Sequence, residues 1–276
     1  MARRSYPTDL SDQEWEIIKR ILEREEPYTT GRHTEVELRE VWNAIFYINK
    51  TGCQWQYLPH DFPPPPTVNY HYRKWMRTGI YPKVNDELRQ QLRKQIGRNE
   101  NPSAGIIDSQ SGKGTVESGP QESGFDGGKL VKGRKRHIIV AIRGYLIVII
   151  VHAASIVDCK GAKQVIAKRF ETLDTVKLIW ADGGYKGKLI DWVKKEFDCV
   201  LEVVKKKKKK GFHVLPRRWV VERTFAWLTR YRRLSKDYEK QPSSSEAMVY
   251  VASIRLMLRR LCEPVELAEV AEMAIP

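Results

Sequence analysis

Two consecutive runs of β-branched residues constrain this chain most. The stretch RKRHIIVAIRGYLIVIIVHAAS, residues 134–155, places Arg143 and Gly144 between one apolar run and a second that is apolar at nearly every position. β-branched residues favour strands, and a continuously apolar strand is typical of a sheet covered on both faces. The stretch therefore predicts an antiparallel hairpin whose second strand lies inside a larger sheet.

The segments around this hairpin alternate between strand and helix patterns. A mixed sheet flanked by helices is the fold class that this order predicts. Residues 111–133 are rich in Gly and Ser and predict a flexible connection. The expected strands are 104–110, 176–182 and 199–205, and the expected helices are 158–173, 186–197, 217–234 and 243–261.

Residues 1–100 predict an all-helical module, and the polar stretch near residue 100 predicts a domain boundary. The expected helix starts in this module are the capping boxes Ser11/Glu14 and Thr34/Glu37, and Thr67 after the four prolines 63–66. A further helix is expected over 82–98. Outside the module, the closing helix is expected to begin with a capping box of Ser243 and Glu246. The third helix is basic and aromatic, and the module resembles a helix-turn-helix unit. Arg73 and Lys74 are its candidate DNA contacts, although three-helix packing without nucleic acid also explains the pattern.

The positive charge is concentrated in one part of the sequence. Residues 104–262 hold 33 basic and 16 acidic residues, an excess of 17, within a chain whose net charge is +15. A globular segment this basic usually binds a polyanion, and the alternative is an enzyme that is merely basic. The lysine run 205–210 predicts non-specific phosphate affinity, and the acidic tail 263–276 predicts a solvated end.

Several classes of protein are disfavoured by composition. The four cysteines form no CxxC pair, which argues against a zinc knuckle and gives no sign of a disulfide framework. No apolar run reaches the 18 or so residues that span a bilayer, and the first ten residues lack the apolar stretch of a signal peptide. We therefore expect a cytoplasmic chain with no membrane contact.

Three acids are candidate metal ligands. Asp108 and Asp182 each follow an apolar strand, where ligands collect in open α/β sheets, and Glu222 is the single acid in the helix 217–234. Converging carboxylates repel one another unless a hard cation such as Mg²⁺ binds between them. Each acid also has a structural explanation: Asp108 and Asp182 can cap the amides that follow them, and Glu222 can pair with Arg218.

Several long strings in this sequence are those of a known family. Residues 10–15 and 31–68 carry its N-terminal pattern, and AGIIDSQS, GKLVKGRKRHIIV, VHAAS, WADGGYKG and GFHVLPRRWVVERTFAWLTRYRRLSKDYE carry its second part. By these strings the chain resembles bacterial insertion-sequence transposases of the DDE class, in the insertion-sequence-five family. The resemblance implies an RNase H-like catalytic domain over 104–262, preceded by a helical module over 1–100 that is expected to bind DNA.

The resemblance also implies roles for individual residues. It makes Asp108, Asp182 and Glu222 the catalytic, metal-binding triad, with Mg²⁺ or alternatively Mn²⁺ as cofactor. Arg218 fits the family's arginine four residues before the Glu, whereas Leu215 and Thr229 depart from its Tyr and Lys. The candidate DNA contacts are Lys129, Lys132, Arg134, Lys135, Arg136, Tyr185, Arg218, Arg223, Arg230, Arg232, Arg233, Arg73 and Lys74. The basic cluster 129–136 can equally be a solvated strand edge, and Trp219 and Trp227 are expected in the core rather than stacked on bases.

The function that the resemblance implies is metal-dependent cleavage at the ends of a mobile element and strand transfer into target DNA. Terminal inverted repeats and target DNA are the expected partners, and a homodimer or larger assembly is expected because two DNA ends are joined. Two alternatives remain open from the sequence: a nuclease or resolvase that cuts without strand transfer, and a catalytically silent DNA-binding protein derived from a transposase.

Overall fold

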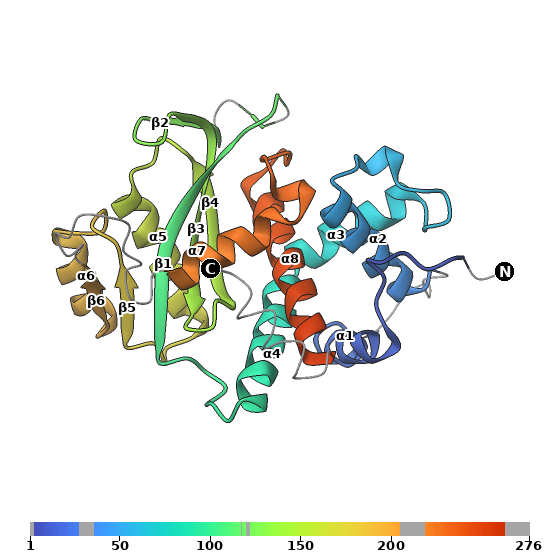
Figure 1. The fold of residues 1–276 in the computed structure, drawn as a ribbon, viewed down its shortest axis with the longest axis horizontal. Coiled ribbons are helices and arrows are strands. Elements are labelled where there is room, and N and C mark those ends of the chain that lie inside the picture. The colour runs from blue at the N-terminus through green and yellow to red at the C-terminus, as the bar shows by residue number, and fades with distance from the viewer. Residues whose placement is uncertain (1–2, 28–35, 117, 120–121, 205–218, 263–276) are drawn as a thin grey trace.

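The computed structural model describes residues 3–27, 36–116, 118–119, 122–204 and 219–262. A mixed sheet with helices on both faces forms one part, and a group of helices from the N-terminal third forms the other (Figure 1). Helix α8 (Pro242–Cys262) lies between these two parts. No described helix is long and apolar enough to cross a membrane.

The sheet has six strands, and its central order explains the fold. Strand β1 pairs antiparallel with β3 and parallel with β5, and β3 also pairs with β4 while β5 pairs with β6. Along the sheet the order is therefore β4, β3, β1, β5, β6, with β2 extending the β4 side. The strands are β1 (Ala104–Lys113), β2 (Gly124–Asp126), β3 (Val131–Ala141), β4 (Leu146–Ala153), β5 (Leu178–Ala181) and β6 (Val200–Val203).

The predicted hairpin is confirmed, and its turn is fixed by packing. Strands β3 and β4 are joined through Arg143 and Gly144, and Gly144 has a left-handed φ of 85°. A Cβ at Gly144 would lie 2.8 Å from Thr224 Oγ1 and 2.9 Å from the Trp227 ring. The turn is therefore seated so closely against helix α7 (Trp219–Thr229) that glycine is needed for space as well as for backbone conformation.

Each face of the sheet is covered by different helices. Side chains on one face join α5 (Asp158–Thr172) and α6 (Lys188–Phe197) in one apolar cluster, which includes Ile107 and Ile179. The other face, with Ile106 and Trp180, joins α7, α8 and the N-terminal helices in a second cluster. Burial on both faces accounts for the nearly continuous apolar sequence of β4.

The N-terminal third is helical, as predicted, with different starts for two helices. The helices are α1 (Asp12–Glu25), α2 (Leu38–Thr51), α3 (Pro65–Arg77) and α4 (Ile80–Gln95), with short 3-10 turns at Trp55–Tyr57 and, later, Arg232–Leu234. The capping box at Ser11 and Glu14 is confirmed. Thr67 is not a cap, because α3 already begins at Pro65, where a missing N–H costs nothing in the first turn.

Two further helix starts also differ from their predicted positions. Glu37 is the N-cap of α2, without a side-chain capping bond, while Thr34 lies outside the described residues. Helix α8 begins at Pro242, so Ser243 lies inside it, and Glu246 instead accepts hydrogen bonds from the Val151 amide and the Lys168 ammonium. Tertiary partners therefore decide these helix ends.

Strand β1 continues past the expected strand 104–110 and reaches Lys113. Its pairing with β3 runs from Gly105–Ala141 to Lys113–Gly133. The polar residues after Asp108 are held in extended form by this long hairpin partner, not by their own propensity.

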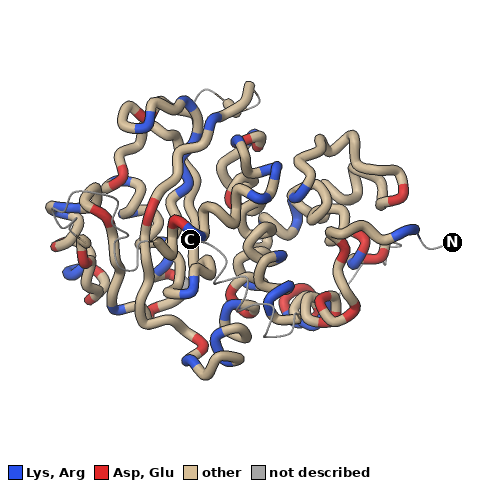
Figure 2. The backbone as a smooth tube through the Cα atoms, viewed as in Figure 1, with Lys and Arg blue, Asp and Glu red and all other residues tan. Residues whose placement is uncertain are grey.

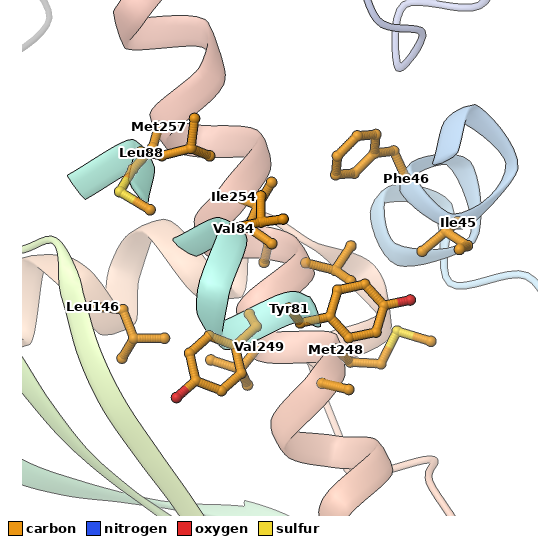
Figure 3. Packing of buried hydrophobic residues seen from close by; sticks show 14 of the residues in the cluster. Ile45, Phe46, Tyr81, Val84, Leu88, Leu146, Met248, Val249, Ile254 and Met257 are labelled. Carbon is orange, nitrogen blue, oxygen red and sulfur yellow. The ribbon is translucent and has the colours of Figure 1, made fainter. Parts of the chain in front are cut away.

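One apolar cluster connects the helical part to the sheet part. Met248, Ile254 and Met257 of α8 meet Val84 and Leu88 of α4, with Leu146 at the start of β4 and Ile45 and Phe46 of α2 close by (Figure 3). The side chain of Asn85 adds polar links, since it donates to Leu146 O at 2.9 Å and accepts from Ser253 Oγ at 2.8 Å. The expected boundary near residue 100 thus separates two patterns of secondary structure that share a core.

Candidate active site

The register of β1 and β5 brings two of the predicted acids together. Ala104, Gly105 and Ile106 pair with Leu178, Ile179 and Trp180 in parallel. The ladder ends at Ile106–Trp180, and the same register continued two residues further would set Asp108 level with Asp182, which directly follows β5. Neighbouring strands lie about 4.8 Å apart, and residues level in a parallel pair point to the same face. Both acids therefore belong to the face of Ile106 and Trp180, which α7 covers.

A backbone amide orients each of these two carboxylates. Ser109 N donates to Asp108 Oδ1 at 2.7 Å, and Gly184 N donates to Asp182 Oδ1 at 2.8 Å. These are the local caps that the sequence offered as an alternative explanation. A local cap and a ligand role are compatible, because a carboxylate has two oxygens and about four acceptor sites.

Glu222 is carried over the same face by α7. Val221 and Phe225 of this helix are buried in the cluster that contains Ile106 and Trp180, while Glu222 itself is exposed. Arg218, its predicted partner, lies outside the described residues. Carboxylate oxygens at Asp108, Asp182 and Glu222 fit the preference of a hard divalent cation. Within the described ranges, however, no three His, Cys, Asp or Glu side chains are close enough to form a metal site, so the triad is not gathered here.

The opposite face carries a polar network that the sequence did not predict. Asp158, in the first turn of α5, accepts from Ser109 Oγ at 3.1 Å and from Lys135 Nζ at 2.9 Å. His137 Nδ1 lies 2.8 Å from His152 Nε2, and burial, together with the charge of Lys135 and other neighbours, lowers the pKa of both imidazoles. The only sequence signal for Asp158 was an acid in the first turn of a predicted helix.

Tyr185 belongs to this network rather than to a DNA surface. Its side chain is 1 % exposed and its ring meets His137 edge-on, with 6.0 Å between the ring centres. Burial raises the pKa of its hydroxyl well above the ordinary value, and the charges of Asp108, Asp158 and Asp182 raise it further. In the described structure the Tyr185 side chain is therefore buried in this network and is not exposed where it could contact DNA.

Most of the predicted basic cluster before the hairpin is also internal. The Arg134 guanidinium is buried and bonded to Glu122, Asp237 and the carbonyls of residues 239 and 240. Arg136 donates to two carbonyls between α7 and α8, and Lys135 pairs with Asp126 and Asp158. Alternation along β3 turns these residues to the two covered faces, so the expectation of five surface cations holds only for Lys129 and Lys132.

The remaining candidate DNA contacts also divide into buried and exposed side chains. Arg233 is buried, with its guanidinium bonded to Glu239, and is corrected to a structural residue. Arg223 is half-buried, donates to Arg143 O at 3.1 Å and stacks on Trp219 and Trp227. Trp227 is in the core as expected, but Trp219 is 43 % exposed. The exposed cations are Arg73, Lys129, Lys132, Arg230 and Arg232, and Lys74 is partly exposed beside Glu26.

Basic residues are spread over both parts of the molecule. Figure 2 shows blue Lys and Arg segments where β2 meets the start of β3 and others along the helices, interrupted by acidic segments. The lysine run 205–210 and the tail 263–276 lie outside the described residues.

The fold and the acids together define the class of this protein. The sheet has the central order β4, β3, β1, β5, β6, which is RNase H-like. One acid lies inside β1, a second directly follows β5, and a third lies on a helix over the same face. Comparison with protein families agrees: residues 99–257 match the family described as transposase DDE domain, and residues 10–85 match the transposase of IS4/5 family.

The first match covers more than half of the chain, so the protein belongs to the DDE transposase family, of the IS4/IS5 type. The resemblance predicted from the sequence is confirmed. Searches of curated proteins and of solved structures found no match.

Proposed function

We propose that this protein is an active DNA transposase that cleaves DNA at the ends of its element and transfers the freed ends into target DNA. The observation that supports this most is the parallel pairing of β1 with β5 beneath α7, because its register, continued two residues further, would bring Asp108 and Asp182 level. Family membership supplies the class of reaction, and the two aspartates supply the ligand chemistry that the reaction needs.

The chain's own side chains have distinct parts in this proposal. Asp108 and Asp182 would hold Mg²⁺ or Mn²⁺, and Glu222 would complete the site once DNA is bound and α7 shifts over the two strands. The bound cation supplies Lewis acidity for displacement at a phosphodiester. The amides of Ser109 and Gly184 hold the two aspartates in one orientation before any ligand arrives.

The exposed cations would hold the DNA backbone. Arg230 and Arg232 follow α7 directly, and Arg223 is stacked between Trp219 and Trp227 on the same helix, so a phosphate placed beside Glu222 would meet several guanidinium groups. Lys129 and Lys132 would extend this contact beyond the start of β3, and Arg73 of α3 would bind the terminal repeat. Joining two DNA ends requires two copies or more, so we propose a homodimer on DNA, acting in the cytoplasm.

The test uses the full-length chain and DNA that carries the element's terminal repeats with a labelled 3′ end. We expect Mg²⁺-dependent cleavage followed by joining of the label to a second duplex, and loss of both steps by at least about a thousandfold in Asp182→Asn. Lys160→Met, an exposed change outside the site, is the matched control and keeps both activities.

The outcomes separate the alternatives. Cleavage without joining would identify a nuclease and overturn the strand-transfer step. Binding of the repeats with no cleavage in either cation would identify a silent DNA-binding derivative. Unchanged cleavage by Asp182→Asn would remove the metal-site assignment.

A further inference from the structure

The two strands that carry the aspartates are not held together at the aspartates themselves. The ladder between β1 and β5 ends with the pair Ile106–Trp180, two residues before Asp108 and Asp182. Beyond that pair the described ladder of β1 continues with β3 on its other side, while Lys129 Nζ donates to Ser109 O at 2.9 Å and Asp237 N donates to Lys113 O at 2.8 Å. Something other than the β1–β5 ladder therefore has to set the spacing of the two carboxylates.

The first turn of α5 spans this gap from the opposite face of the sheet. Asp158 Oδ1 accepts from Ser109 Oγ at 3.1 Å, and Ser109 directly follows Asp108. The next residue, Cys159, donates its thiol to Gly184 O at 3.2 Å, and Gly184 N donates to Asp182 Oδ1 at 2.8 Å. A chain of hydrogen bonds thus runs from the strand of Asp108 through α5 to the carboxylate of Asp182.

A buried ammonium fixes the near end of this chain. Lys135 Nζ lies 2.9 Å from Asp158 Oδ1, 3.2 Å from Asp126 Oδ2 and 3.1 Å from Ile156 O, and its side chain is 5 % exposed. Burial alone would raise the pKa of Asp158, but the hydrogen bond and charge of Lys135 outweigh it and the pKa is lowered. Asp158 is therefore held as a carboxylate, pointed at Ser109.

Two glycines allow the helix to approach this closely. A Cβ at Gly161 would lie 2.4 Å from His152 Nε2 and 2.5 Å from His137 Cε1. A Cβ at Gly184 would lie 3.0 Å from Asp182 Oδ1 and 3.8 Å from Asp158 Oδ2. The start of α5 is thus packed against β3 and β4 without room for a Cβ at Gly161, and the turn after β5 lies within ordinary contact distance of Asp158.

We propose that Asp158 is a positioning residue, which fixes the separation of Asp108 and Asp182 by tying Ser109 to the turn that holds Gly184. The inference rests on the proposed function, because it assigns Asp158 an effect on cation binding by those two aspartates. In this proposal Asp158 acts through Ser109 and Lys135, both of which donate to its Oδ1, and not as a ligand of the cation. Outer partners of this kind typically change metal affinity 10–100-fold when removed.

The chain offers a closely matched pair of variants for the test. Ser109 and Ser111 lie on the same face of β1, and each donates its hydroxyl to an aspartate that also pairs with Lys135. Only Ser109 bonds directly to Asp158, which precedes the Cys159 that bonds to the turn after β5, whereas Ser111 reaches Asp158 only through Asp126 and Lys135. Ser109→Ala and Asp158→Asn are therefore the test variants, and Ser111→Ala is the control.

The primary measurement is direct binding of Mn²⁺ to the purified full-length protein with DNA, by titration calorimetry, with the melting temperature recorded for each variant. We expect about tenfold weaker Mn²⁺ binding in Ser109→Ala and Asp158→Asn, and wild-type binding in Ser111→Ala at a similar loss of melting temperature. Cys159→Ala should weaken binding too, and Cys159→Ser, which keeps a donor, should restore it.

The results separate this inference from the proposed function. Suppose that the wild type binds Mn²⁺ and Asp182→Asn does not, which supports the proposed function. If Ser109→Ala and Asp158→Asn then bind Mn²⁺ as tightly as Ser111→Ala, the positioning role is overturned and the proposed function stands. If wild type and Asp182→Asn bind Mn²⁺ equally, the metal site itself is overturned, and the positioning role goes with it.

Discussion

At the scale of single residues, burial divides cations that look alike in the sequence. Lys132, Arg134 and Arg136 occupy every second position of β3 and so lie on one face of the strand. Lys132 is nevertheless exposed, whereas Arg134 and Arg136 are buried. A buried guanidinium needs several acceptors in fixed positions, and Arg134 has the carboxylates of Asp237 and Glu122 and three backbone carbonyls. Charge excess in a sequence therefore overstates the charge available for DNA.

We expect Arg134→Lys to destabilise the fold by about 3 kcal/mol, because the shorter ammonium cannot satisfy acceptors arranged for a planar fork and leaves Asp237 buried and poorly paired. Urea unfolding at pH 7 measures the change. Lys132→Met on the same strand is the control, with an effect within about 0.5 kcal/mol. Equal costs for the two variants would contradict the structural role of Arg134.

His137 predicts a dependence of stability on pH. Burial first, and then the charge of His152, lowers the pKa of His137 to about 3, against the attraction of Asp158. The folded protein keeps His137 neutral, while the unfolded chain takes up a proton below about pH 6.5. Stability from this group is therefore complete above pH 6.5 and is lost as the pH falls towards 3.

We expect the wild type to lose about 2 kcal/mol more unfolding free energy than His137→Gln between pH 7 and pH 5. Denaturant unfolding at the two pH values measures this difference. His152, Asp158, Lys135 and Lys129 also face His137, and the comparison with the variant cancels their shared contributions to first order. A variant as pH-sensitive as the wild type would show that His137 is charged in the folded state.

At the scale of elements, tertiary contacts decide where helices and strands begin and end. The hairpin partner β3 extends β1 through a polar sequence to Lys113, and α3 begins at Pro65, before the expected start at Thr67. The turn of the hairpin depends on α7, since Thr224 Oγ1 donates to Gly144 O at 2.8 Å and the Trp227 ring closes over the turn.

Two glycines with similar backbone angles separate strain from packing. Gly79 has a φ of 71° and nothing near its missing Cβ, whereas Gly144 has a φ of 85° and two close neighbours. We expect Gly79→Ala to cost about 1 kcal/mol from left-handed strain alone. Gly144→Ala should cost about 1–3 kcal/mol more, because a Cβ there overpacks against α7. Equal losses in thermal or urea unfolding would mean that α7 yields to the hairpin turn.

At the scale of the whole molecule, one core joins the helical third to the sheet. Helix α8 is buried along most of its length, against α4 and α2 on one side and β4 on the other (Figures 1 and 3). Arg255 of this helix also pairs with Glu14 of α1, and both side chains are less than 10 % exposed. The helical module thus supplies part of the environment in which α8 folds.

We expect a fragment of residues 99–276 to lack a fixed tertiary structure, because Met248, Ile254 and Met257 lose the apolar partners that α2 and α4 provide. Near-ultraviolet circular dichroism should show weak signals and a hydrophobic dye should bind, while the full chain unfolds in one transition. A fragment that melts cooperatively with native-like side-chain signals would show that the catalytic part folds by itself.

The sequence by itself determined the hairpin, the alternation of later strands and helices, the helical N-terminal third and the acids Asp108 and Asp182, because periodicity and turn residues are local. The tertiary structure alone decided which cations reach solvent, how far β1 extends, and that Asp158 ties the strand of Asp108 to the turn after Asp182. These features depend on strand register and on which helix covers each face of the sheet. Both are set by contacts between residues far apart in the chain, which local sequence patterns do not predict.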